Sequence, residues 1–202
     1  MRAEPTAHGD DVSGSHPTVC GLNVSMVTVA DWPVFLWSSM HRDSGDLFAV
    51  GDTMSWDVEL IDGHAAGWPE HVLADVMVTI RPRPSWSLRG AIADAGGIQA
   101  CWRGPEPPGT ALPLSAGLVA DVWNPPFRAV ATGVVRRIRT VAYARSERGG
   151  VLLPTGPWML EDVERTPRWL ATAKPGDDPS VVREDGLLVN LAITQNTIER
   201  WD

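Results

Sequence analysis

Asp57 and Glu59 are the two side chains whose types and spacing come closest to acid–base chemistry. They lie two residues apart in a segment that alternates polar and apolar side chains, so they point to the same side of a predicted strand, about 7 Å apart. Two carboxyl groups at that distance form a general acid–base pair when they face a cavity. On the wet side of a strand they are only solvated, and this is the interpretation we favour.

Metal chemistry has weaker support in the sequence. His64 and His71 flank the start of a predicted strand, but none of the five histidines are two or four residues apart, which is the spacing that places two ligands on one face. Cys20 and Cys101 are isolated thiols without a CxxC pair, which predicts free buried cysteines. We therefore expect no metal site and no cofactor.

Recognisable catalytic motifs are also missing. The sequence contains no GxGxxG opening a helix, no GxxxxGK[ST], no HExxH and no GxSxG. We assign no catalytic residue, and this favours a binding protein over an enzyme.

Charge divides the chain into two parts. Asp46–Ile80 holds seven acids and no Lys or Arg, whereas Arg81–Arg148 holds ten arginines and four acids. We favour a sheet surface on which acidic and basic strands pair. The alternative is an anion-binding face around Arg137 and Arg139, together with Arg136. The net charge of −8 argues against a nucleic-acid partner, because phosphate binding depends on Lys and Arg.

Tryptophan is the outlier in composition, with ten residues against three Phe and one Tyr. Trp56 lies among apolar neighbours and is predicted to be in the core. Other tryptophans fall at strand ends or in loops, where they either pack at the core edge or form the rim of a ligand site: Trp32, Trp37, Trp68, Trp86 and Trp123. Asp121 interrupts a predicted strand, and we expect it to pair with Arg137 or Arg139.

Period-two alternation is the main evidence for the elements that hold these side chains. Gly133 is expected to form a bulge or a bend, Asp31-Trp32-Pro33 to end the first strand, and Leu88–Ala95 to form a short helix. The predicted strands are Leu22–Ala30, Thr53–Ile61, His71–Ile80, Ile98–Trp102, Leu118–Trp123, Ala129–Arg145, Val151–Leu153, Trp158–Val163 and Gly186–Thr194.

These elements predict a mainly β fold, a small barrel or sandwich of about seven or eight strands with Pro/Gly-rich loops and at most one or two short helices. We prefer the barrel. Residues 1–20 lack periodicity and are expected to form a disordered arm, followed by a single domain over residues 21–202. The sequence shows neither a signal peptide nor a membrane span, which predicts a cytoplasmic protein.

Three sequence pieces carry a resemblance: Asp31-Trp32, Phe48-x-Val50-Gly51-Asp52-x-x-x-Trp56 and Thr132-Gly133-x-Val135-x-Arg137-Ile138-Arg139-x-Val141. They resemble the recurring motifs of an uncharacterised actinobacterial family of small proteins, which has no assigned function to carry over. The sequence departs from the family where a cysteine-containing segment is expected before Phe48. Any thiol or metal role of that loop is therefore in doubt here.

Three functions remain open. The preferred one is a non-catalytic barrel that binds an anionic protein or metabolite through Trp32, Trp37, Trp123, Asp121, Arg137 and Arg139. The second is a barrel enzyme or ligand carrier that uses Asp121 or Asp57 in an internal pocket. The third is a nucleic-acid binder that uses the strand Arg128–Arg148.

Overall fold

The computed structural model describes residues 31–39, 41, 47–120, 125–148, 151–168, 170 and 186–200. This part of the chain is mainly β, as predicted, and contains a short 3-10 helix, η1 (Glu70–Val72). Its nine strands are β1 (Trp32–Trp37), β2 (Thr53–Asp62), β3 (Ala74–Arg81), β4 (Ala91–Ala95), β5 (Ile98–Trp102), β6 (Ala111–Ala120), β7 (Arg128–Arg148), β8 (Val151–Val163) and β9 (Gly186–Glu199).

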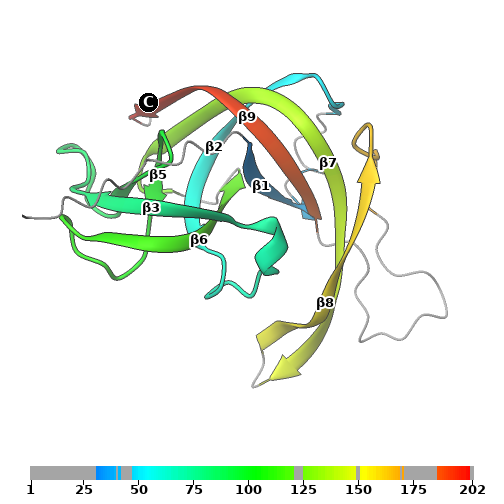
Figure 1. The fold of residues 1–202 in the computed structure, drawn as a ribbon. Helices are drawn as coiled ribbons and strands as arrows, with labels where there is room; N and C mark the ends of the chain where they lie inside the picture. The colour runs from blue at the N-terminus through cyan, green and yellow to red at the C-terminus, as the bar shows by residue number, and fades with distance from the viewer. Residues whose placement is uncertain are drawn as a thin grey trace, which may run out of the picture.

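Eight of these strands close into a barrel in the order β2-β5-β4-β3-β6-β1-β9-β7, and β7 returns to β2. The ninth strand, β8, pairs with β7 beyond the ring. Figure 1 shows β7 curving around the barrel with β9 beside it, and its distal end projecting with β8 as a ribbon. A closed sheet of this kind leaves few exposed strand edges.

Strand β2 belongs to two parts of the wall. Its first half, Thr53 to Asp57, pairs with β7, and its second half, Val58 to Asp62, pairs with β6. Its inward side chains Trp56, Val58 and Leu60 are buried in the main core, while the residues between them are more exposed. This alternation confirms the strand predicted over 53–61.

Pro33, which is expected to mark the end of a strand, does not interrupt strand pairing. Pro33 lies inside β1, opposite Asn190 of β9. Val34 and Leu36 face the main core and Phe35 faces a second cluster, so the strand is buried on both sides. A strand buried on both sides shows no polar alternation, which hid it in the sequence. The strand predicted at 22–30 lies outside the described residues.

The short helix predicted over 88–95 is also absent from the described structure. Ala91–Ala95 forms β4, which pairs with β5 through a hairpin whose turn residues, Gly96 and Gly97, have positive φ angles of 52° and 89°. Alanine-rich β4 has little β propensity of its own, so its pairing with β3 and β5 decides its conformation.

Two further boundaries differ from the predictions. Strand β6 begins at Ala111, seven residues earlier than expected, and includes Pro113 opposite Met77. Strand β8 runs continuously from Val151 to Val163 through the expected turn, with a register shift against β7 near Ala142 and Ala144. Prolines in the local sequence predict breaks, but pairing of β6 with β3 and of β8 with β7 keeps both segments extended.

Gly133 lies at an irregularity of the β7–β9 ladder, but the extra residue is on the other strand: Thr132 pairs with Gln195 and Gly133 with Ile193, which leaves Thr194 of β9 unpaired. A second shift occurs between Val135 and Arg137, leaving Arg136 as the extra residue. Beyond this bulge, Ile138 continues the main core, while Val141 and Tyr143 face the second cluster.

That second cluster covers the side of the wall opposite the main core. Phe35 lies 5.5 Å from Trp68 and 5.7 Å from Trp158 between ring centroids, and Tyr143 stacks on Trp158 at 5.5 Å. Trp37 packs edge-on against Phe35 at 4.8 Å. These five residues form the outer aromatic cluster, which ties β8 to the barrel.

Candidate functional site

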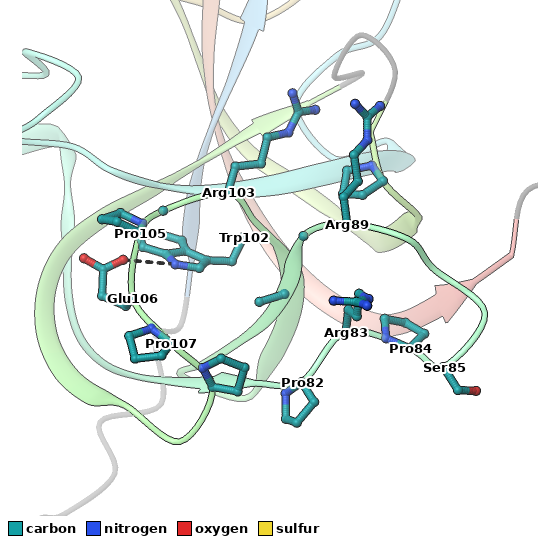
Figure 2. A pocket seen from close by; sticks show the side chains of 15 residues that line it. Pro82, Arg83, Pro84, Ser85, Arg89, Trp102, Arg103, Pro105, Glu106 and Pro107 are labelled. Atoms are coloured by element: carbon teal, nitrogen blue, oxygen red, sulfur yellow. Dashed lines mark hydrogen bonds between the residues drawn. The ribbon is translucent and has the colours of Figure 1, made fainter.

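The loops β3–β4 and β5–β6 meet at one end of the barrel because β3, β4, β5 and β6 are antiparallel neighbours. Between them lies an open cleft of about 730 Å³, the arginine cleft (Figure 2). It is lined by Pro82, Arg83, Pro84, Ser85, Arg89, Gly90, Ala91, Trp102, Arg103, Gly104, Pro105, Glu106, Pro107, Pro108 and Pro126.

One wall of the cleft is the loop between β3 and β4. Prolines fix φ in its first part, which holds the chain extended after Arg81. Arg83 Nε donates to the carbonyl of Ser87 at 2.8 Å, and the Ser87 hydroxyl lies 2.9 Å from the carbonyl of Arg89 and 3.0 Å from that of Pro126. These bonds tie the loop to itself and to the segment before β7.

Gly90 completes this wall. Its φ is +77°, and a Cβ atom there would lie 2.6 Å from Pro126 Cγ. Glycine is therefore required both by the backbone conformation and by the close approach of Pro126.

The opposite wall is built on Trp102. Its indole N–H donates to Glu106 Oε2 at 3.2 Å, as Figure 2 shows, and the backbone at Gly104 passes against the indole ring. The ring is buried, so it supports the loop between β5 and β6 from below. The rigid frame of this wall comes from one tryptophan and the prolines around it.

Three arginines give the cleft its charge. In Figure 2 the side chains of Arg89 and Arg103 extend in the same direction, with Arg83 below Arg89. Arg103 Nε lies 2.9 Å from Glu59 Oε2 of the neighbouring strand β2. Glu106 is the carboxylate among the lining residues, and it accepts the Trp102 N–H. The lining therefore carries a positive balance, in contrast with the chain as a whole.

Arg89 and Arg103 both influence the pKa of the buried Cys101. The pKa of this thiol is raised to about 12, chiefly by burial and also by the nearby Glu59 carboxylate. The charges of Arg103 and Arg89 oppose this rise. Burial also raises the pKa of Glu59, an effect that the charge of Arg103 reduces.

A second cleft of about 530 Å³, the Trp86 cleft, adjoins the first. It is lined by Trp86, Ser87, Leu88, Arg89, Pro125, Pro126 and Arg200, so Arg89 and Pro126 line both clefts. Leu88 is 93% exposed, and Trp86 is 37% exposed with its ring edge-on to Phe127.

The strand arginines expected to bind an anion lie elsewhere, on β7. Arg137 donates from Nε and Nη2 to the two oxygens of Asp162 on β8, the second at 2.7 Å. Arg139 is 7% exposed and donates to Asn190 Oδ1 at 2.9 Å, and burial lowers its pKa. The predicted partner Asp121 lies outside the described residues.

The predicted rim tryptophans separate in the structure. Trp32 is 1% exposed and belongs to the main core, so of the two alternatives for this residue the packing one holds and the rim position does not. Trp37 is 39% exposed and belongs to the outer aromatic cluster. Trp123 lies outside the described residues. The structure thus does not bring Trp32 and Trp37 together with Arg137 and Arg139 in one of the two clefts.

Asp57 and Glu59 each have an arginine partner. Asp57 accepts from Arg128 Nε at 3.0 Å, and Arg128 also lies 3.5 Å from Glu199. With the Glu59–Arg103 pair, these contacts join the acidic β2 to the basic part of the chain, as expected. Neither carboxylate lines the two clefts.

Metal ligands do not converge in the part of the chain that the structure describes. No group of three or more His, Cys, Asp or Glu side chains there could hold an ion. His41 is buried, with Nε2 2.9 Å from the carbonyl oxygen of Pro167.

The cleft residues Arg83, Arg89 and Arg103 were missed by the sequence analysis. They lie in loops, where no periodicity marks a shared surface. The available signal was the alternation Arg81-Pro82-Arg83-Pro84 followed by Arg89-Gly90 and Arg103-Gly104, in which stiff or tightly turning backbone carries repeated arginines.

Comparison with protein-family models, curated proteins and solved structures gave no match to this chain. The resemblance to an actinobacterial family therefore stays a prediction. Among the described residues, no helix is long and apolar enough to cross a membrane.

Proposed function

We propose that this barrel is a non-catalytic binding module for an anionic partner, and that the arginine cleft is its recognition site. The observation that carries the proposal is the placement of Arg83, Arg89 and Arg103 around one open cleft in a chain of net charge −8. Guanidinium groups match carboxylates and phosphates through paired hydrogen bonds.

The frame around the cleft supports this function. Proline-rich loops lose little conformational entropy when a ligand orders them. The hydrogen bonds of Ser87 and of Trp102 hold both walls in place. Binding residues on loops that a rigid β scaffold positions are a common arrangement in binding proteins.

The β7 arginines fit recognition less well. The Arg137 guanidinium already has a bidentate carboxylate partner, and Arg139 is buried. Neither of these arginines lines the two clefts.

The enzyme alternative has less support. A general acid or base needs a carboxylate that faces a cavity. Asp57 pairs with Arg128, Glu59 pairs with Arg103, and Glu106 in the cleft accepts the indole N–H of Trp102.

Isothermal titration calorimetry with inorganic tripolyphosphate at low ionic strength tests the proposal. We expect binding to the wild-type chain and a loss of about tenfold or more in affinity when Arg83 and Arg89 are both changed to Gln. Arg136→Gln, at an exposed arginine on the β7 bulge, is the matched control and should bind as the wild type does. Equal affinity in the double variant and the control would refute the proposal.

A further inference from the structure

We infer that the anionic partner is a protein segment: a short acidic peptide with an apolar side chain, which lies across the arginine cleft and the Trp86 cleft together. The inference rests on the proposed function and adds the class of partner.

The first argument is that the two clefts adjoin each other. Arg89 and Pro126 line both, so a ligand that pairs with Arg89 meets the Trp86 cleft directly. The clefts measure about 730 and 530 Å³, which together exceed the roughly 300–1,000 Å³ of typical small-molecule sites. An extended chain can occupy both clefts at once, whereas a compact metabolite fits within one of them.

The second argument is the chemistry of the Trp86 cleft. Leu88 is 93% exposed and Trp86 is 37% exposed. Both line this cleft together with Arg89, which follows Leu88 in the sequence. Trp and Arg are enriched at the centres of protein–protein interfaces, where an apolar anchor enters a pocket with a polar rim. A free inorganic or sugar phosphate would gain nothing from Leu88.

Charge complementarity indicates that the partner is negatively charged. Arg83, Arg89, Arg103 and Arg200 line the two clefts, and Glu106 is the acid among the lining residues. Carboxylates of Asp or Glu in the peptide would pair with the arginines, while its apolar side chain packs on Trp86 and Leu88.

Nucleic acid is the competing macromolecule and fits less well. Its dense phosphate charge would be repelled by the rest of a chain with net charge −8. Stacking of successive bases needs several open aromatic faces, whereas the Trp102 ring is buried against Gly104 and Trp86 is the aromatic side chain in the two linings that is partly exposed.

The test uses two arrays of synthetic acidic peptides, each about ten residues long as in short linear recognition motifs. One array carries a Leu, Phe or Trp among Glu and Asp residues, and the other carries Ser in its place. We expect the full wild-type chain to bind members of the first array at least about fivefold more tightly than their Ser counterparts.

Two variants separate this inference from the proposed function. Leu88→Ser should weaken binding of the apolar peptides by about fivefold or more, yet leave the tripolyphosphate titration unchanged. Leu47→Ser, at a leucine that is 51% exposed and lines neither cleft, is the matched control and should change neither. Urea unfolding of each variant checks that it folds as the wild type does.

Three outcomes would overturn the inference. If the Leu and Ser peptides bind with equal affinity while the chain binds tripolyphosphate in its separate titration, the peptide inference is refuted and the proposed anion binding is retained. Oligothymidylate that binds more tightly than the peptides, through Arg83 and Arg89 and with steep salt dependence, assigns the site to nucleic acid. Absence of tripolyphosphate binding removes the proposed function itself.

Discussion

Glu59 Oε2 and Arg103 Nε lie 2.9 Å apart and join the barrel wall to the arginine cleft. The carboxylate is largely buried, whereas the guanidinium side chain is about half exposed. The pair therefore couples the protonation of a wall residue to the position of a cleft residue.

Glu59→Gln is expected to change how stability depends on pH. Burial raises the pKa of Glu59 above 4.5, so the folded chain holds this proton more tightly than the unfolded chain does. The free energy of unfolding must then fall as pH rises from the unfolded to the folded pKa. Urea unfolding from about pH 4 to about pH 7 should show a smaller fall in the variant. Parallel curves would contradict the assignment.

Cys101 should resist thiol reagents in the folded protein. It is fully buried, and its pKa is raised to about 12, so the reactive thiolate is scarce at neutral pH. In a Cys20→Ser chain at about pH 8, a disulfide reagent should label Cys101 slowly before unfolding and completely in denaturant. Rapid labelling without denaturant would show that this part of the wall opens readily.

Arg137→Gln should raise the pKa of Asp162. The hydrogen bonds from Arg137 are the main reason that this pKa lies below 3.8, and the charge of Arg139 adds to the effect. We expect a rise toward 3.8 that stays incomplete while Arg139 is present, measured by side-chain carboxyl NMR. The pair contributes stability above the unfolded pKa and loses it as pH falls. Arg136→Gln serves as control and should leave the titration unchanged.

Gly133→Ala should destabilise the barrel by about 1–3 kcal/mol, the cost typical of overpacking. A Cβ atom there would lie 2.4 Å from the carbonyl oxygen of Ala192, which is backbone and cannot rotate away. Gly97→Ala is the comparison, since an added Cβ atom there has no neighbour within 4 Å and the substitution is disfavoured only by the positive φ of 89°. Urea unfolding of both variants measures the difference, and a smaller loss for Gly133→Ala would contradict the close approach.

The barrel could be predicted from the sequence because strands such as β2 face the core on one side and water on the other. Trp56, Val58 and Leu60 are buried, and the residues between them are not. That contrast produces the period of two on which the prediction depended.

The parts that sequence reasoning missed lack that contrast. Strand β1 is buried on both sides, so Pro33 stood out as a break although it lies inside the ladder. The arginine cleft depends on loops brought together by the antiparallel order of β3 to β6, and this pairing is not encoded in local periodicity. Asp121 and Trp123 lie outside the described residues, and their binding roles stay predictions.

The order of the strands in the ring also determines how late during synthesis the barrel can close. Strand β1 has its antiparallel partner β9 about 150 residues further along the chain, and ribosomes add roughly 5–20 residues per second. During this interval β1 and β7 each present an unsatisfied backbone edge. A chain truncated before Gly186 would keep those edges permanently, and we expect it to aggregate where the full-length product does not.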